Sequence, residues 1–448
     1  MTDRLLDVAR RLTALLRGAL DVPVAVRLWD GSLEPLGPVD DDSPVVHVTS
    51  PGVLPSLVRR PSLDRLIRHY AHGRIELEGG TLVDLAHAFG ARSLGRSLKR
   101  IERGSLVRAL WPFVLAPGDP PDAARGYAGE ISGSGRAVDD NRRYVSFHYD
   151  VGNDFYRLFL DPEMQYSCAY YPSWEASLET AQRAKLEMIC RKLRLAPGER
   201  LLDIGCGWGG LVCHAARHYG VRAHGITLSE EQLAFARDRI RRLGLDGRVT
   251  VELRDYRSVE GTFDKIASIG MYEHIGIANI EAYFRRVRRL LADGGLFLNH
   301  AISRGAKRKR RRFGSRPEQR ALQRYIFPGG ELDDIGHTLA EMEKAGFEVH
   351  DVEGWRWHYA RTTRLWCERL TARRAEAEAL VGPETFRIWV AYLGGCAIAF
   401  ERGSARLFQT VAGRTAKGAP PVPPTRADLY RSPADAAGAP GQAPSAAD

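Results

Sequence analysis

The sequence predicts an α/β protein built on a parallel sheet, with a smaller α+β domain before it. Apolar stretches of strand length alternate with amphipathic helical patterns between residues 201 and 301, and such alternation produces a parallel sheet with helices on both faces. A glycine-rich turn, 205–210, joins the first of these strands to its helix. Residues 115–141 are rich in Pro, Gly, Ala and Ser and are predicted to be a linker between the two domains.

Length, charge and cysteine usage limit the class of protein. A chain of 448 residues is expected to hold more than one domain. The net charge of +10 predicts attraction to a polyanion, either nucleic acid or an anionic membrane surface. The six cysteines are scattered, without a C-x-x-C pair or a histidine cluster at ligand spacing. We therefore expect no metal site and no disulfide framework, and a reducing cytosol is favoured.

No segment is expected to cross a membrane. Charges interrupt every apolar run near the N-terminus, which does not resemble a signal peptide. The longest uncharged apolar stretch, Ile388 to Phe400, is too short to span a bilayer. A soluble or peripheral protein is the expectation.

The first domain, 1–114, is predicted to bind or dock rather than to catalyse. Residues 1–20 form a helical pattern whose apolar face we expect to pack on the same domain; a helix lying on a membrane is the alternative. Strands are predicted over 22–29, 45–50 and 74–80, and a helix over 62–71. The sequence of this domain shows no nucleophile, base or ligand cluster.

An aromatic segment, 141–174, opens the second domain, which is predicted over 142–412. Tyrosines, His148 and Cys168 lie among short loops here, a pattern that favours a pocket wall over simple core. A helix follows over 177–195, with apolar residues on one face. The alternating region then gives strands at 201–204, 221–226, 248–253, 263–269 and 294–301, and helices at 211–219, 230–243 and 279–292.

The turn after the first of these strands carries a ligand signature. Asp203 lies near the end of the strand, and Gly205, Gly207 and Gly209 follow at alternate positions. Residues without a Cβ let a ligand approach the backbone closely. The free N–H groups at the start of the next helix then face that ligand.

Two cofactors fit such a turn. Gly205, Gly207 and Gly210 match the dinucleotide pattern G-x-G-x-x-G, which also requires a carboxylate about 20 residues on, at the end of the next strand. That strand ends instead in Thr227, Leu228 and Ser229. This Thr-Leu-Ser end, Asp203 in the turn motif and an Asp-Tyr pair at 255–256 are typical of S-adenosylmethionine (SAM) methyltransferases. SAM is therefore favoured over NAD.

Later strand ends and a basic run add candidates. Ligands of parallel sheets bind outside the carboxyl ends of the strands, so Glu273 and His300 are expected near the same site. The basic run 307–312 is interpreted either as a solvated loop or as a contact for phosphate headgroups.

The C-terminal part is predicted to hold an apolar helix and a tail. The helix, 385–403, contains Gly394 and Gly395. Paired glycines cost helix stability, so they are expected to make room for a bulky apolar ligand or for another helix. Residues 413–448 contain almost no large apolar residue and are predicted to be disordered.

Eight motifs stand in a fixed order along the second domain: HYDVGNDFYRLFLDPEMQYSCAYY, LLDIGCGWGG, GITLSEEQ, DYR, GMYEHIG, NHAIS, YIFPGG and HYARTTRLW. In this order they resemble the cyclopropane-fatty-acyl-phospholipid synthases and the related mycolic acid cyclopropane synthases. The match covers about 140–410, and the first domain resembles the lipid-binding domain of the phospholipid-acting members. The resemblance implies a class I SAM-dependent methyltransferase (Rossmann-like) fold for the second domain.

The resemblance also implies a reaction. SAM gives a methylene group to the cis double bond of an unsaturated acyl chain of a phospholipid, a cyclopropane ring forms, and a bound bicarbonate ion is the base. An alkene is a poor nucleophile, so the methyl carbon and the π bond must be aligned in a dry pocket, and aromatic faces suit the transient carbocation. Glu273-His274 and His300 match the ring-forming members, so a ring is favoured over the alternative product, a methyl- or methylene-branched chain.

The bicarbonate set implied by the family falls on Cys168, Glu273, His300, Ile302 and Tyr359. Backbone donors at Cys168 and Ile302, together with the His300 and Tyr359 side chains, would bind the anion. Glu273 would relay its proton. Tyr149 is expected to line the same pocket. Cys396 matches a family cysteine that is a candidate nucleophile, but the mechanism needs no thiolate and a packing role is favoured.

The SAM set implied by the family is Tyr166, Ser167, Asp203, Gly205, Cys206, Gly207, Gly209, Thr227, Leu228, Ser229, Gln232, Tyr256 and Arg257. Tyr166, Ser167 and the glycine turn would hold the methionine end. Gln232 would reach the ribose, and Tyr256 would stack on adenine.

Partners and location follow from the same resemblance. We expect unsaturated phospholipid at a membrane surface as the partner, no nucleic acid, and a cytoplasmic protein that is peripheral on the inner face of the membrane; relatives often form homodimers. The run 307–312 would add membrane attraction. A nucleic-acid methyltransferase would carry an Asn-Pro-Pro-Tyr or Pro-Cys type loop where this chain has GMYEHIG. A non-enzymatic lipid-transfer protein would not need an intact SAM site.

Overall fold

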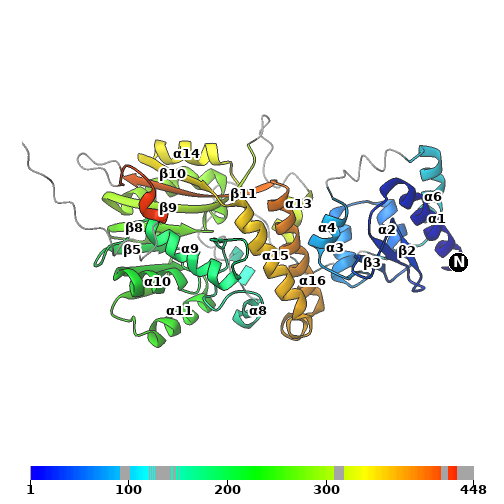
Figure 1. Ribbon diagram of the computed structural model, residues 1–448, viewed down its shortest axis with the longest axis horizontal. Coiled ribbons are helices and arrows are strands. Elements are labelled where there is room, and N and C mark those ends of the chain that lie inside the picture. Colours follow the sequence, from blue (N-terminus) through cyan, green and yellow to red (C-terminus); the bar gives the residue numbers. More distant parts are fainter. Residues whose placement is uncertain are drawn as a thin grey trace, which may run out of the picture.

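The computed structural model describes residues 2–90, 101–120, 122, 124, 126, 143–144, 148–149, 151–306, 317–414 and 422–430. Most of the predicted linker 115–141 and the whole basic run 307–312 therefore lie outside the described residues. A small N-terminal domain and a larger α/β domain follow each other along the chain (Figure 1).

The N-terminal domain is an α+β unit, as the sequence predicts. Its strands are β1 Ala25–Arg27, β2 Leu33–Pro35, β3 Val45–Val48 and β4 Ile75–Glu78. Its helices are α1 Thr2–Leu20, α2 Val53–Arg59, α3 Leu63–Ala71, α4 Leu82–Ala88 and α6 Arg103–Leu115. The sheet has the order β2-β1-β3-β4, in which β1 and β3 are parallel and the other pairs antiparallel.

Helix α1 packs on its own domain. Leu5, Val8, Ala9 and Leu12 follow a helical period, are buried, and pack in one cluster with Phe113 of α6. For α1 this confirms the packed helix over the membrane-lying alternative.

The larger domain is organised around a seven-stranded sheet. Its strands are β5 Arg200–Ile204, β6 Arg222–Thr227, β7 Val249–Leu253, β8 Phe263–Ile269, β9 Leu291–Arg304, β10 Phe347–Gly354 and β11 Ala405–Arg414. The order is β10-β11-β9-β8-β5-β6-β7. Strands β5 to β9 are mutually parallel, which confirms the parallel sheet predicted for this region. Strand β11 was not predicted, and it runs antiparallel to both of its neighbours.

Helices cover both faces of this sheet (Figure 1). One face carries α9 Leu178–Lys192, α10 Gly210–Tyr219 and α11 Glu230–Arg242, and the other carries α12 Ile280–Leu290 and α14 Ile335–Lys344. Side chains alternate along a strand, so Leu298 of β9 packs in the first core and Phe297 packs in the second. The hydrophobic cores on the two faces of the sheet therefore hold the strands in place, including the end of β5 from which the glycine turn leads.

The remaining described elements are α8 Asn153–Arg157, η1 Tyr256–Ser258, η2 Tyr272–His274, η3 Ile277–Asn279, α13 Pro317–Tyr325, α15 Arg356–Ala372, α16 Arg374–Glu401 and α17 Ala427–Tyr430. Helices α15 and α16 lie side by side next to the N-terminal domain (Figure 1). A Cβ on Gly394 of α16 would lie 3.1 Å from the Leu82 Cβ of α4 and 3.5 Å from the Cys367 Sγ of α15. Gly394 therefore makes room for neighbouring helices.

Part of the predicted tail is packed on the sheet domain. Leu429 of α17 is buried, and its carbonyl accepts a hydrogen bond from Arg191 of α9 at 3.2 Å. Arg426 forms an ion pair with Asp351 at 2.6 Å. A second ion pair joins Asp428 to Arg194 at 3.2 Å. For residues 422–430 the structure thus differs from the predicted disorder, because a buried leucine and two ion pairs attach the segment to the sheet domain.

Candidate active site

The turn between β5 and α10 has the geometry that its glycines predict. Gly205, Gly207 and Gly209 have φ angles of 85, 53 and 78°, in the left-handed region that residues with a Cβ rarely adopt. A Cβ on Gly205 would lie 3.1 Å from the Met271 side chain. The Gly205 N–H donates to the Ile226 carbonyl at 3.0 Å, which ties the turn to the end of β6.

A cavity opens beside this turn, at the carboxyl ends of β5, β6 and β8. From the predicted sets, its wall includes Tyr149, Tyr166, Ser167, Asp203, Gly205, Cys206, Gly207, Thr227, Leu228, Gln232 and Tyr256. The ends of β5, β6 and β8 and the residues that follow β7 therefore converge on one cavity, whereas Glu273, His300 and Ile302, which were expected near the same site, are not part of its wall.

Gly209, Ser229 and Arg257 are not in this wall and have local roles instead. Gly209 is the N-cap of α10. Ser229 caps α11, and its Oγ accepts the Gln232 N–H at 3.3 Å. Arg257 is paired with Asp255 at 2.8 Å. Each of these contacts orients an element that supplies wall residues.

Several wall residues were not in the predicted set: Gln165, Lys185, Trp208, Arg254 and Met271. Lys185 is the most informative of them because it is buried on α9. It lies four residues after Ala181 and four before Ile189, on the apolar face of that helix. A lysine at an apolar helical position is the sequence signal that could have identified it.

Lys185 holds two other residues of the cavity wall in place by hydrogen bonds. Its Nζ donates to Gln165 Oε1 at 2.5 Å and to Ser167 Oγ at 2.9 Å. Burial lowers the pKa of Lys185 to about 8, with the nearby Asp161 acting in the opposite direction. Burial also raises the pKa of Asp203 to about 7, and Lys185 opposes that shift. The Asp203 Oδ1 atom is buried and has no hydrogen-bond partner among the described residues, so it is free to accept from a ligand.

Three residues of the predicted anion set, Glu273, His300 and Ile302, lie on η2 and on β9. Glu273 Oε1 accepts the N–H of Ile302 at 2.5 Å, whereas Oε2 is buried without a partner in the described part of the chain. Burial raises the pKa of Glu273 to about 7, and the hydrogen bond from Ile302 opposes this shift. The Ile302 N–H, which the resemblance assigned to the anion, is thus engaged in holding Glu273.

His300 lies two residues before Ile302 on the same face of β9. Its Nδ1 is 3.0 Å from Gln409 Nε2, and its Nε2 is buried without a partner among the residues described. Burial lowers the pKa of His300 well below its ordinary value, and the charges of Lys185 and Lys192 lower it further. The lowered pKa favours the neutral imidazole.

Cys168, Tyr359 and Cys396 gather in one apolar cluster around Trp355. The Trp355 ring meets the His300 ring edge-on, with centroids 5.5 Å apart, and Tyr359 follows one turn later in α15. Burial raises the pKa of Cys396 to about 12 and that of Cys168 well above its ordinary value. These raised pKa values disfavour a thiolate at either residue.

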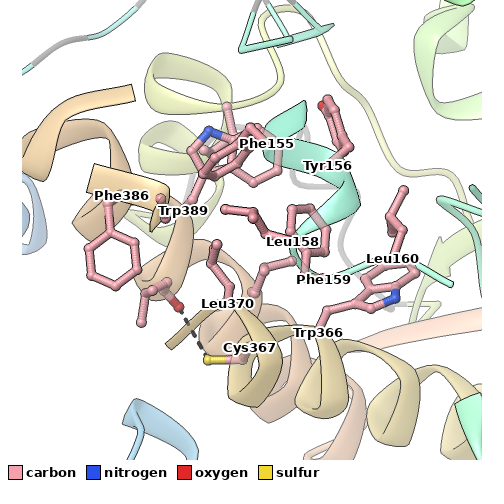
Figure 2. Packing of buried hydrophobic residues seen from close by; sticks show 14 of the residues in the cluster. Phe155, Tyr156, Leu158, Phe159, Leu160, Trp366, Cys367, Leu370, Phe386 and Trp389 are labelled. Carbon is pink, nitrogen blue, oxygen red and sulfur yellow. Dashed lines mark hydrogen bonds between the residues drawn. The ribbon is translucent and has the colours of Figure 1, made fainter. Parts of the chain in front are cut away.

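The aromatic segment supplies both wall and core. Tyr149 and Tyr166 line the cavity, and their rings lie 6.4 Å apart. Phe155, Tyr156 and Phe159 instead pack in the buried core against α15 and α16 (Figure 2). The predicted pocket wall is thus formed by individual tyrosines that extend from a packed aromatic core.

The cavity residues fit SAM. The unpartnered Asp203 oxygen suits the ammonium group of the methionine end, the glycine turn admits close approach, and Thr227 and Gln232 offer polar groups for hydroxyls. The described residues contain no group of three or more His, Cys, Asp or Glu side chains that could hold a metal ion.

Comparison with known proteins agrees with this geometry. Residues 137–410 match the family described as mycolic acid cyclopropane synthetase. This chain belongs to that family. A probable fatty acid methyltransferase of Pseudomonas putida is 39% identical over 419 residues, which are 92% of this chain and 98% of the relative. The cyclopropane-fatty-acyl-phospholipid synthase of Escherichia coli is 41% identical over 267 residues, 60% of this chain and 66% of the relative.

Solved structures of this family have the same catalytic fold. A cyclopropane synthase of Mycobacterium tuberculosis superposes with a TM-score of 0.58 at 33% identity, over 60% of this chain and 97% of that one. A mycolic acid cyclopropane synthase complexed with SAH and CTAB gives 0.57 at 34% identity, over the same shares. This member of the mycolic acid cyclopropane synthetase family is thus a SAM-dependent methyltransferase of class I fold. Within the described ranges, no helix combines the length and the apolar character needed to cross a bilayer.

Proposed function

We propose that this enzyme transfers a methylene group from SAM to the cis double bond of unsaturated acyl chains in membrane phospholipids, and forms a cyclopropane ring with bicarbonate as the base. The observation that carries the proposal is a pair of buried atoms without partners, Glu273 Oε2 and His300 Nε2. Leaving a buried polar atom unpaired costs about 1–3 kcal/mol. Bicarbonate has both a hydroxyl donor and acceptor oxygens, so it has a partner group for a carboxylate oxygen and for an imidazole N–H alike.

In this reaction, residues of the chain would accept the released proton and would keep water away from the reacting carbon atoms. When bound, SAM supplies an electrophilic methyl group to the double bond, and closing the ring then releases one proton from that added carbon. Glu273, with a pKa of about 7, exchanges protons near neutral pH and would accept this one from the bound ion. The rings of Tyr149 and Tyr166 would exclude water and present π faces to a cationic acyl chain.

Helix α6 supports the membrane part of the proposal. Val107, Trp111 and Leu115 are 61, 58 and 73% exposed, and their spacing of four residues places them on one face. Arg103 and Arg108 are exposed on the same helix. An apolar face with a tryptophan and flanking arginines is typical of a helix that lies among lipid headgroups.

A second candidate is the formation of a methyl- or methylene-branched chain. It is favoured by the Pseudomonas putida relative, which aligns with 92% of this chain and is named a probable fatty acid methyltransferase. Both candidates use the same cofactor and double bond, and in both a proton leaves the added carbon. In the methylene-branched product a hydride first shifts along the acyl chain to the cationic carbon, so loss of the proton forms a double bond to the added carbon in place of a ring. A saturated methyl branch would then require a reductant as well.

The test incubates the protein with labelled SAM and vesicles of a monounsaturated phospholipid, in buffer freed of carbon dioxide and then supplemented with bicarbonate. Proton NMR of the released fatty acids distinguishes the strongly shielded ring methylene of a cyclopropane from the alkene protons of a methylene branch. Ring product that depends on bicarbonate supports the proposal. Alkene product selects the second candidate. Label that enters free fatty acid or nucleic acid, and no phospholipid, contradicts the phospholipid substrate.

A further inference from the structure

Gln409 is the partner of His300 across the sheet. Strand β11 pairs with β9 in a register that sets Gln409 directly opposite His300, and directly opposite residues of antiparallel strands share a face. Both side chains are buried, with 0 and 1% exposed. The Gln409 Nε2 atom and the His300 Nδ1 atom are 3.0 Å apart.

Lys192 fixes which end of the Gln409 amide faces His300. The Lys192 Nζ atom lies 2.8 Å from Gln409 Oε1. An ammonium group has donors and no acceptor, so the amide atom that it meets must be the oxygen. The side chain of Lys192 is fully buried and is itself held by an ion pair with Glu353. The amide nitrogen, which only donates, is thereby left to face the imidazole.

This arrangement determines the tautomer of His300. A neutral imidazole has one N–H and one acceptor nitrogen, and the partner of one nitrogen decides the state of the other. Because Gln409 donates to Nδ1, the Nδ1 atom must be the acceptor, and the single proton lies on Nε2. That Nε2 atom is the one that has no partner among the described residues.

We propose that Gln409, oriented by Lys192, is a positioning residue that holds His300 in its Nε2–H tautomer, so that the imidazole donates a hydrogen bond to the anion at the active site. The role of the anion rests on the proposed function, whereas the tautomer does not. With the Nδ1–H tautomer, Nε2 would instead turn a lone pair towards the anion, which would repel it.

The experiment measures the tautomer directly in the full-length protein. The protein is labelled with 15N-histidine, and the side-chain nitrogens are observed by NMR without SAM or lipid. The chain has 13 histidines, so a His300→Asn variant assigns the signals. We expect a protonated Nε2 and an unprotonated Nδ1 for His300.

Gln409→Glu tests the cause. It keeps the size of the side chain but replaces the amide by a carboxylate, which accepts from Lys192 and from His300 alike. We expect Nδ1 to become protonated, the dissociation constant for SAM to stay unchanged, and kcat on phospholipid vesicles to fall on the order of 10- to 100-fold. Gln323→Glu is the matched control, because Gln323 bonds only the Gly330 carbonyl among described contacts, at 2.9 Å; it should change neither the His300 signals nor kcat.

The outcomes separate the two hypotheses. A wild-type protein with Nδ1 of His300 protonated, or a Gln409→Glu variant with unchanged tautomer or unchanged kcat, overturns the positioning role. If the glutamate variant does not fold, Gln409→Met replaces it: that variant should show a mixture of tautomers, and a single Nε2–H form would overturn the proposal. A wild-type protein that shows the expected tautomer but gives no lipid product contradicts the proposed function alone.

Discussion

Glu273 accepts the backbone N–H of Ile302 at 2.5 Å, so the only side-chain carboxylate of the predicted anion site is held by the strand that also carries His300. One carboxylate oxygen is thereby fixed, and the other is buried without a partner in the described structure. This contact orients Glu273, the residue proposed to accept the proton, before any ligand arrives. It also makes Glu273 a group whose charge can be removed without removing its backbone contact.

Glu273→Gln should abolish most turnover and leave SAM binding intact. The amide oxygen can still accept the Ile302 N–H, but an amide cannot take a proton. We expect kcat to fall about 10²- to 10⁴-fold, the usual range for loss of a general base. Measurement of kcat with vesicles and of the SAM dissociation constant by calorimetry checks this. Glu341→Gln on α14, the same chemical change at a residue outside both predicted sets, is the control, and a joint loss of SAM binding in Glu273→Gln would contradict the division of the site.

The same variant should become relatively more stable as the pH rises. The pKa of Glu273 in the folded protein is about 7, above its ordinary value of 4.5. The stability contributed by the protonated form is therefore complete below about pH 4.5 and is lost as the pH rises towards 7. Glutamine does not carry this penalty, so its advantage over the wild type should grow between pH 5 and pH 8, on the order of 3 kcal/mol.

Thermal unfolding of both proteins at pH 5 and pH 8 measures this difference. Glu341 provides a control of opposite sign, because its hydrogen bond to Lys344 lowers its pKa. Glu341→Gln should lose stability relative to the wild type at pH 8. Equal differences at the two pH values for Glu273→Gln would mean that Glu273 is solvated in the folded protein.

Gly394 and Gly395 should respond oppositely to alanine. A Cβ at Gly394 would lie 3.1 Å from Leu82 in the N-terminal domain, whereas nothing lies within 4 Å of a Cβ at Gly395. Overpacking typically costs about 1–3 kcal/mol, and a free helical site gains about 1 kcal/mol from Gly to Ala. We expect Gly394→Ala to lower the melting temperature and Gly395→Ala to raise it. A raised melting temperature for Gly394→Ala would show that α4 does not pack closely at Gly394, and a lowered one for Gly395→Ala would contradict the open space at that position.

Trp111→Ser on α6 should weaken binding to anionic vesicles. The indole is 58% exposed in the free protein, and removing it forfeits apolar burial in the headgroup region, about 1.4 kcal/mol or a tenfold weaker partition. Vesicle sedimentation at several salt concentrations measures the partition. Trp357→Ser is the matched control, because that tryptophan is 53% exposed on α15. Unchanged binding for Trp111→Ser would remove α6 from the proposed contact.

Sequence reasoning located the cofactor cavity well, for a physical reason. Asp203, the glycine turn and the Thr-Leu-Ser end all follow strands that are adjacent in a parallel sheet, so their positions in the chain already determine which edge they share. The sequence did not indicate that Arg257 and Ser229 lie outside the cavity wall. The direction of a side chain at the end of a strand depends on local contacts, such as the Arg257–Asp255 ion pair.

Strand β11 was missed because its buried polar residues interrupt the apolar pattern that indicates a core strand. Gln409 and Thr410 are almost fully buried there. They are tolerated because partners from distant parts of the chain satisfy them, as Lys192 and His300 satisfy Gln409. The same reason explains why Lys185 was not identified: its bonds to Gln165 and Ser167 exist only after the helix and the loop meet.

The order of residues alone determined the sheet of alternating strands, the cofactor turn and the family, because each depends on spacing along a continuous segment. Only the folded chain decided the state of the candidate catalytic groups. The raised pKa of Glu273, the engaged Ile302 N–H and the orientation of His300 by Gln409 come from burial and from contacts between residues up to 109 positions apart. Burial and long-range hydrogen bonds are properties of position in space, which spacing along the chain does not specify.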